Sequence, residues 1–365
     1  VLLVVHDFLP ASVAGVEVFV HDLARGLAAA GDDAVVAHTV RGAGLAQHAL
    51  QPGRVGEIRT WQLVQNYPYR PLVESVEDPQ AERRFDELLE REQPDLVHLH
   101  HLWGWSAGLP QRARRASVPA LLHLHDHWLT CPSGGQLFHP DGHVCETPDR
   151  ARCDDCYARF RSREGRLERL AMRAARHLPR PLPPDLLHRG FAGLPGGARG
   201  LLKKINERPA GSAPAAVEGE AHRRWEILRN ALDRVDGFVS PSRDLARRMA
   251  QLGIARSRIA VIPNGTAIEA AAATPPGAAD PERPLALLFL GTPVPHKGAH
   301  VVAEAVAGLE GAARLTIHGH DPAASYARRL ALPHVELAGP LPRESVAAAI
   351  DGSDLLCLPS LWPEN

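Results

Sequence analysis

Six histidines gather near the ends of two strand-like segments of this 365-residue chain. They are His98, His100, His101, His123, His125 and His127. Alternate residues of a strand point to one face, and the ends of parallel strands open into the crevice where ligands bind. His125 is therefore our candidate site residue, and Asp126 beside it could orient an imidazole ring or act on a hydroxyl group. For His98, His100 and His123 the pattern favours packed or hydrogen-bonded structural roles.

A loop with an anion-binding pattern follows the apolar segment Leu285–Leu290. Gly291 ends that segment, Thr292 opens the loop, and Lys297 and Gly298 precede a helical stretch. A lysine ammonium and the amides of a helix N-terminus both attract phosphate groups. We therefore expect these four loop residues to bind a diphosphate, with Lys297 supplying the charge and Thr292 one hydroxyl donor. A diphosphate leaving group carries roughly two negative charges, which such a clamp would stabilise.

Four of the five cysteines lie in one stretch and are spaced C-x13-C-x7-C-x2-C. They are Cys131, Cys145, Cys153 and Cys156. In a cytoplasmic protein a Cys-x-x-Cys pair with two further thiols favours a tetrahedral structural zinc site. The alternatives are four reduced thiols or two disulfides in an irregular loop.

The elements that must position these groups alternate between strand and helix. Short apolar runs suit parallel strands buried on both faces, and the stretches between them carry helical periodicity. Strands are expected over residues 1–5, 34–38, 95–100, 119–126, 237–240, 258–265, 285–290, 313–319, 335–339 and 354–360. Helices are expected over residues 16–27, 80–92, 106–115, 299–309, 325–330 and 343–350. This order predicts an α/β protein with two Rossmann-like, doubly wound domains.

The expected domains differ in content. Residues 1–255 form the first domain, which includes the cysteine-rich loop 131–156 and a basic insertion at 157–224. Residues 256–365 form the second domain, which carries the phosphate loop. The insertion could contact anionic lipid headgroups or a lipid-linked acceptor, or it could be a solvated surface segment.

Composition and charge narrow the class of protein. The formal net charge is −1, which gives no general attraction to nucleic acid. The sequence shows neither a secretory signal nor a run of eighteen or more apolar residues, so we expect a cytoplasmic protein, associated with membranes only through the basic insertion.

The order of landmarks along the chain resembles the family-4 retaining glycosyltransferases, two-domain enzymes of the facing-Rossmann (GT-B) type. The landmarks occur at residues 10–17, 94–100, 125–128, 241–242, 261–265, 289–298 and 359–364. The resemblance covers nearly the whole chain, with three departures. Ala14-Gly15 replaces a common Gly-Gly pair, Thr292 replaces an arginine, and the second glutamate of the Glu-x7-Glu motif would lie beyond Asn365.

The resemblance implies a transferase that uses a nucleotide-diphosphate sugar, a UDP- or GDP-sugar, and no catalytic metal. It matches His125 to a histidine that contacts the donor sugar and phosphate, and Glu364 to a glutamate that holds the donor sugar. It places Gly15 and Asn264 among the residues that bind the donor. The acceptor would be a glycan or a lipid-linked sugar, and the pathway polysaccharide or glycolipid synthesis.

Two other functions remain open at this level. A metal-dependent hydrolase would use a metal ion at His123 and His125 with carboxylates nearby. A degenerate, non-catalytic scaffold of the same fold would explain Thr292 in place of arginine. Because the donor motif is incomplete within these 365 residues, we also expect transfer activity and full stability to need about 50–100 further residues.

Overall fold

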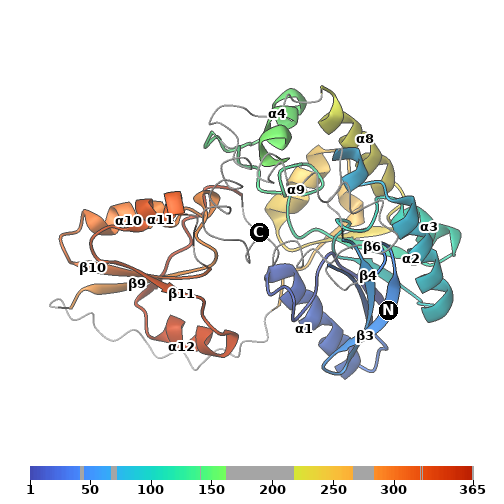
Figure 1. The fold of residues 1–365 in the computed structure, drawn as a ribbon, viewed down its shortest axis with the longest axis horizontal. Helices are drawn as coiled ribbons and strands as arrows, with labels where there is room; N and C mark the ends of the chain where they lie inside the picture. The colour runs from blue at the N-terminus through green and yellow to red at the C-terminus, as the bar shows by residue number, and fades with distance from the viewer. Residues whose placement is uncertain are drawn as a thin grey trace, which may run out of the picture. The chain divides into compact units, whose positions relative to one another are not determined.

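The computed structural model describes residues 1–41, 45–66, 72–139, 141–161, 218–265, 283–320, 322 and 324–363. These residues form two compact units, which are described separately (Figure 1). The first comprises Val1–Gly135 and Pro148–Gly265, and the second Gln136–Thr147 and Thr266–Glu364.

The first unit is built on an eight-stranded sheet in the order β3-β4-β2-β1-β5-β6-β7-β8. Its strands are β1 Leu2–Val4, β2 Val35–Val40, β3 Leu50–Val55, β4 Ile58–Val64, β5 Val97–Leu99, β6 Ala120–His123, β7 Gly237–Ser240 and β8 Ile259–Val261. Its helices are α1 Gly15–Ala29, α2 Pro79–Glu92, α3 Leu109–Arg115, α4 Arg150–Arg161, α8 Glu220–Leu232 and α9 Arg243–Gln251. Neighbouring strands are parallel except β3, an edge strand that pairs antiparallel with β4.

Alternation along the central strands divides the core of the first unit in two. Leu2 and Val4 of β1 belong to the cluster that packs under α2, α3, α8 and α9, whereas Leu3 belongs to the cluster under α1. In the same way Val97 and Leu99 of β5 face the larger cluster. The residues between and after them therefore point to the face that α1 covers.

The second unit has a parallel sheet in the order β11-β10-β9-β12. Its strands are β9 Leu285–Leu290, β10 Ala313–His318, β11 Val335–Gly339 and β12 Leu355–Leu356, and its helices are α10 Ala299–Ala307, α11 Ala324–Leu330 and α12 Val346–Asp351. Figure 1 shows α10 and α11 on one side of this sheet and α12 on the other. Ala299, Ala303 and Ile317 are among the buried residues that join α10 to β10.

The alternating pattern of the sequence is confirmed, with several corrections. The strand expected over 119–126 ends at His123, so His125 and Asp126 lie in the loop that follows. The strand expected over 354–360 is reduced to Leu355–Leu356. Both β3 and β4 are elements that the sequence reasoning did not identify.

The division between the units also differs from the expected one at 255/256. β8 completes the first sheet, and the first unit extends to Gly265. Within the cysteine-rich loop, Gln136–Thr147 groups with the second unit, where Phe138 lies 6.1 Å from the His296 ring. Most of the expected basic insertion, residues 162–217, lies outside the described residues.

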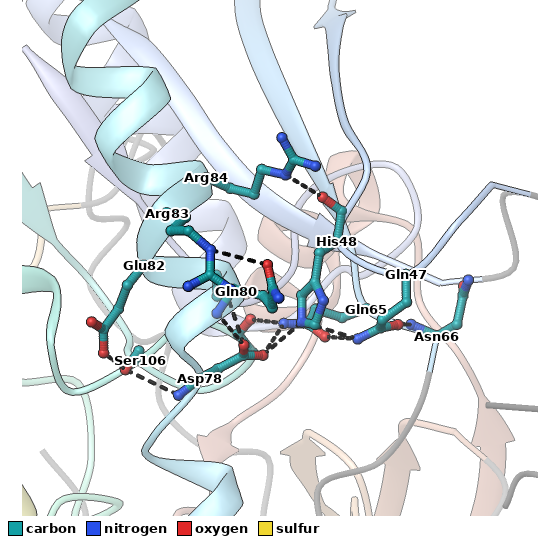
Figure 2. Close-up of polar contacts among 12 residues, drawn as sticks. Gln47, His48, Gln65, Asn66, Asp78, Gln80, Glu82, Arg83, Arg84 and Ser106 are labelled. Atoms are coloured by element: carbon teal, nitrogen blue, oxygen red, sulfur yellow. Dashed lines mark hydrogen bonds and ion pairs between the residues drawn. The ribbon is translucent and has the colours of Figure 1, made fainter. Parts of the chain in front are cut away.

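A polar network anchors α2 at the edge of the first sheet (Figure 2). Asp78 is the N-cap of α2, and its Oδ1 accepts hydrogen bonds from the amides of Gln80 and Ala81. Its Oδ2 accepts from His48 Nε2 at 2.8 Å and from Gln65 Nε2 at 3.1 Å. Burial alone would raise the pKa of Asp78, but the His48 pair and the other hydrogen bonds lower it to about 2.

Replacing Asp78 with alanine is expected to lower the free energy of unfolding of the first unit by about 2–3 kcal/mol, because it removes a cap and leaves buried donors unpaired. Because folding lowers the pKa of Asp78, the contribution of its carboxylate to the free energy of unfolding is present above about pH 4. This contribution is lost as the pH falls towards about 2. Chemical denaturation at pH 7 and at pH 3 measures both effects. Asp78→Asn keeps one acceptor oxygen and should lose less. An unchanged unfolding midpoint for Asp78→Ala would contradict the assignment.

Candidate active site

The carboxyl ends of three adjacent parallel strands bring together a group of polar side chains in the first unit. His6 follows β1, His101 follows β5, and Asp126 follows β6. The His6 and His101 rings lie 4.5 Å apart, and His101 Nε2 lies 3.9 Å from Asp126 Oδ2. The first turn of α1 adds Glu17, 1% exposed, whose Oε1 lies 3.3 Å from His6 Nε2. The carboxyl ends of these strands therefore carry two acidic groups beside two imidazoles, as expected for a ligand crevice of a doubly wound sheet.

The loop that carries Asp126 is held from both sides. Asp126 Oδ1 accepts a hydrogen bond from the Trp128 amide at 2.7 Å, which turns the chain directly after β6. Gly135, at φ +76°, passes so close that an added Cβ would lie 2.8 Å from the Trp128 nitrogen. The fully buried Arg224 of α8 donates to the carbonyls of Trp128 (2.6 Å) and Leu129 (3.3 Å) and lies over the Trp128 ring at 4.6 Å.

Asp126 is the carboxylate with the most altered acidity in this group. Burial raises its pKa to about 6, although the Trp128 amide and the Arg224 charge oppose the rise. Its side chain nevertheless keeps 29% of its surface exposed, so a ligand can reach it. A carboxylate with a pKa near neutrality and an accessible oxygen is suited to accept a proton or a hydrogen bond from a hydroxyl group.

The histidine predicted as a site residue lies next to this carboxylate but has a different partner. His125 Nε2 shares a 3.0 Å hydrogen bond with His100 Nδ1, and its ring stacks on His123 with the ring centroids 4.3 Å apart. The structure therefore assigns the orientation of the His125 ring to His100, whereas the contacts of Asp126 are with His101 and the Trp128 amide. Burial, and then the neighbouring histidines, keep the pKa of His125 well below its usual value.

Several members of this group were missed by the sequence reasoning. His6 directly follows the first strand, so its position at a strand end was a usable signal. Glu17 was visible as an acidic residue in the first turn of an apolar helix. Arg224 gave no such signal, because it reaches the Asp126 loop from 96 residues away along the chain.

The loop that the sequence predicts to bind phosphate lies at the carboxyl end of β9. Lys297 ends a 3₁₀ turn, Pro295–Lys297, and its Nζ lies 5.3 Å from the centre of the Trp362 ring. Gly298, at φ +71°, is the N-cap of α10, and an added Cβ would lie 2.0 Å from the Pro359 carbonyl oxygen. The loops that follow the neighbouring strands β9 and β12 are thus in contact, as the Leu361 amide confirms by donating to His296 O at 2.9 Å.

The amides near Gly298 are less available than expected. The His300 amide donates to the Tyr326 hydroxyl group at 3.3 Å, and the Val301 amide donates to Gly298 O at 2.8 Å. Gly291 and Thr292 are exposed at the opening of the loop. Lys297 is therefore the principal attraction for an anion that this loop offers.

The other residues predicted to bind the sugar donor stay predictions. Gly15 is the first residue of α1, close in sequence to Glu17. Asn264 is exposed in the first unit, near His123, whose pKa burial lowers to about 4. Glu364 lies outside the described residues.

The four clustered cysteines form no disulfide among the described residues. Cys153 and Cys156 lie one turn apart on α4, and Cys131 is buried in the same unit, whereas Cys145 belongs to the second unit. Among the described residues, the sets of three or more potential ligands within 4.8 Å of one another contain no cysteine. A zinc site at these four residues stays a prediction.

Comparison with known proteins identifies the class. The family model of Glycosyltransferase Family 4 matches residues 13–178 and 148–270, which together span more than half of the chain. The protein therefore belongs to Glycosyltransferase Family 4, a result that favours glycosyl transfer over the hydrolase alternative. No curated protein matches the chain.

Solved structures agree on the fold. HepE from Anabaena, solved with UDP and glucose, has a TM-score of 0.53 at 14% identity over 100% of this chain and 74% of that one. The catalytic domain of starch synthase IV from Arabidopsis thaliana, bound to ADP and acarbose, has a TM-score of 0.50 at 14% identity over 99% and 78%. The lipopolysaccharide outer core galactosyltransferase WaaB, in its apo form, has a TM-score of 0.52 at 12% identity over 98% and 73%. The fold is that of the two-domain GT-B glycosyltransferases.

Proposed function

We propose that this protein is a retaining glycosyltransferase that transfers a sugar from a UDP- or GDP-sugar to a hydroxyl group of a glycan or lipid-linked acceptor, in polysaccharide or glycolipid synthesis. The observation that carries the proposal is the accessible carboxylate of Asp126, with its raised pKa, at a strand end of a family-4 chain. The UDP bound to HepE supports a UDP-sugar as the first donor to test.

Each predicted residue has a separate task in this reaction. His125 contacts the donor sugar and its phosphate, and Asp126 accepts a hydrogen bond from the acceptor hydroxyl group as that oxygen attacks. Lys297 binds the diphosphate and stabilises the charge that develops on it as the sugar leaves. Glu364 accepts hydrogen bonds from the donor sugar. The chain supplies these groups without a catalytic metal.

A panel of nucleotide sugars tests the proposal on the full-length protein. One UDP- or GDP-sugar should raise the melting temperature and release its nucleoside diphosphate when an acceptor is present. The anomeric configuration of the product, read by NMR, tests retention directly. Inversion at the anomeric carbon would refute the retaining mechanism, and nucleotide binding without turnover would favour the scaffold alternative.

We place the reaction at the cytoplasmic side of a membrane, where residues 157–224 would contact anionic headgroups or a lipid-linked acceptor. The basic composition of this insertion supports the proposal. In the part of the chain that the structure describes, no helix has the length and apolar character needed to cross a bilayer. Flotation with anionic and with neutral vesicles distinguishes surface binding from none.

A further inference from the structure

Three imidazoles meet inside the first unit, on and next to the adjacent strands β5 and β6. His98 and His100 alternate along and just after β5, and His123 ends the adjacent strand β6. Because Val97 and Leu99 face the larger core, the two β5 histidines point to the opposite face, under α1. Phe19 of α1 lies over this group, 4.7 Å from the His123 ring and 5.8 Å from the His100 ring.

The ring nitrogens of these histidines converge. One nitrogen from each of His98, His100 and His123 lies within 4.8 Å of the others. The His98 and His100 ring centroids are 4.2 Å apart, and His123 lies 5.6 Å and 5.4 Å from them. Apolar packing alone does not require three nitrogens to face a common point.

Ring nitrogens of this group also lack the hydrogen-bond partner that buried polar atoms normally have. His98 Nε2 and His100 Nε2 are buried without a hydrogen-bond partner among the described residues. His100 and His123 are 1% and 4% exposed, so bulk water does not replace the missing partners. Because an unsatisfied buried nitrogen destabilises a fold, a single ligand that binds several of these nitrogens would stabilise this one.

The other ring nitrogen of His100, Nδ1, already has a hydrogen-bond partner, as in most histidines that bind a metal ion. His100 Nδ1 shares its hydrogen bond with His125 Nε2 at 3.0 Å. When His100 Nδ1 carries the proton, its Nε2 presents a lone pair to the group. Such a hydrogen bond on the far nitrogen fixes the tautomer and the ring orientation of a histidine that binds a metal ion.

We propose that His98, His100 and His123 form a binding site for one transition-metal ion, with zinc as its main occupant. Neutral imidazole is a preferred zinc ligand, and three imidazoles leave a fourth tetrahedral position for water. Zinc–nitrogen bonds of about 2.0–2.1 Å place ligand nitrogens roughly 3.3 Å apart, so the group needs to contract by about 1.5 Å or less.

Metal titration of the metal-free protein tests this site. We expect about one equivalent of Zn²⁺ to bind and to raise the melting temperature, and Co²⁺ to bind with visible bands but without a sulfur-to-metal charge-transfer band. His98→Leu and His123→Leu should each weaken the binding by about 100-fold or more. His222→Gln, which removes an exposed histidine of α8, is the matched control and should leave the binding unchanged.

A second pair of variants distinguishes metal binding at the histidines from metal binding at the cysteine-rich loop. Binding at the histidines should persist when Cys153 and Cys156 are replaced by serine. X-ray absorption of the zinc-loaded cysteine-to-serine protein, which keeps all three histidines, covers the case in which a histidine variant does not fold. The spectrum should show nitrogen ligands at about 2.0–2.1 Å and no sulfur at about 2.3 Å. Binding that survives His98→Leu, sulfur ligation that accounts for all of the metal, or no binding at micromolar zinc would each overturn the proposal.

Discussion

Replacing Asp126 with asparagine is expected to stabilise the first unit at pH 8 and to reduce glycosyl transfer by at least about a hundredfold. The two effects have one origin, a carboxylate kept ionised in surroundings that disfavour its charge. Burial raises the pKa of Asp126 from 3.8 to about 6, so its ionisation at pH 8 is unfavourable in the folded protein. A positioned acid or base contributes about 10²–10⁴-fold to a rate, and the amide cannot replace it.

The expected gain in stability has a defined size and pH window. A rise of one unit in a pKa corresponds to a free energy of about 1.4 kcal/mol. The rise at Asp126 therefore sets an upper limit of about 3 kcal/mol on the gain in stability. Because 29% of the side chain is exposed, we expect about 1–2 kcal/mol. Since the pKa is raised in the fold, the destabilisation is absent below about pH 4 and develops as the pH rises through about 6. The advantage of Asp126→Asn should therefore vanish at pH 4.

Chemical denaturation and initial rates between pH 4 and pH 8 measure both effects. The native protein should also lose activity below about pH 6, where Asp126 becomes protonated. Asp95→Asn, in the exposed loop before β5, removes the same charge and should change neither property. An active Asp126→Asn protein would remove Asp126 from the reaction. A variant less stable than the native protein at pH 8 would show that the Trp128 hydrogen bond outweighs the effect of burial.

The sequence predicted the repeated strand–helix order because each central strand is a short apolar run between turns. The N-terminus of α1 and the β9 loop follow from this pattern, and Lys297 could be placed from it. The edge strand β3 was missed because Pro52 and Gly53 interrupt its apolar alternation, and such residues are tolerated at a sheet edge.

The detailed contacts of the site were not predictable from local patterns. The alternation of His123, His125 and His127 suggested a strand that continued to Asp126. The structure ends the strand at His123, because the Asp126 carboxylate binds the Trp128 amide and turns the chain. The contact between Arg224 and that loop depends on how α8 packs. Periodicity carries no information about such a distant contact.

The histidine group illustrates the same limit. The sequence suggested packed or hydrogen-bonded structural roles for His98 and His100. It did not indicate that their ring nitrogens meet His123, because that depends on the register of β5 against β6.

Replacing Lys297 with alanine is expected to weaken the binding of UDP or GDP about ten- to hundredfold. Lys297 lies at the carboxyl end of β9, and the β12 loop packs against the same turn through Gly298 and Pro359. A charge-assisted hydrogen bond contributes about 1.5–3 kcal/mol, which corresponds to that range of affinity. Two of the first amides of α10 are already hydrogen-bonded, and residues 291–298 contain no other lysine or arginine. We therefore expect no other group in this loop to compensate for the loss of the Lys297 charge.

Isothermal titration calorimetry with UDP and GDP measures the effect in the full-length protein. Arg314→Ala, on an exposed position of β10, removes a positive charge from the same unit and should leave the affinity nearly unchanged. Lys297→Arg keeps the charge and should recover part of the affinity, with a steeper dependence on salt than Lys297→Ala. If Lys297→Ala and Arg314→Ala bind the nucleotides as tightly as the native protein, the diphosphate does not bind at this loop. If both weaken the binding equally, the attraction comes from the overall charge of the unit and not from the position of Lys297.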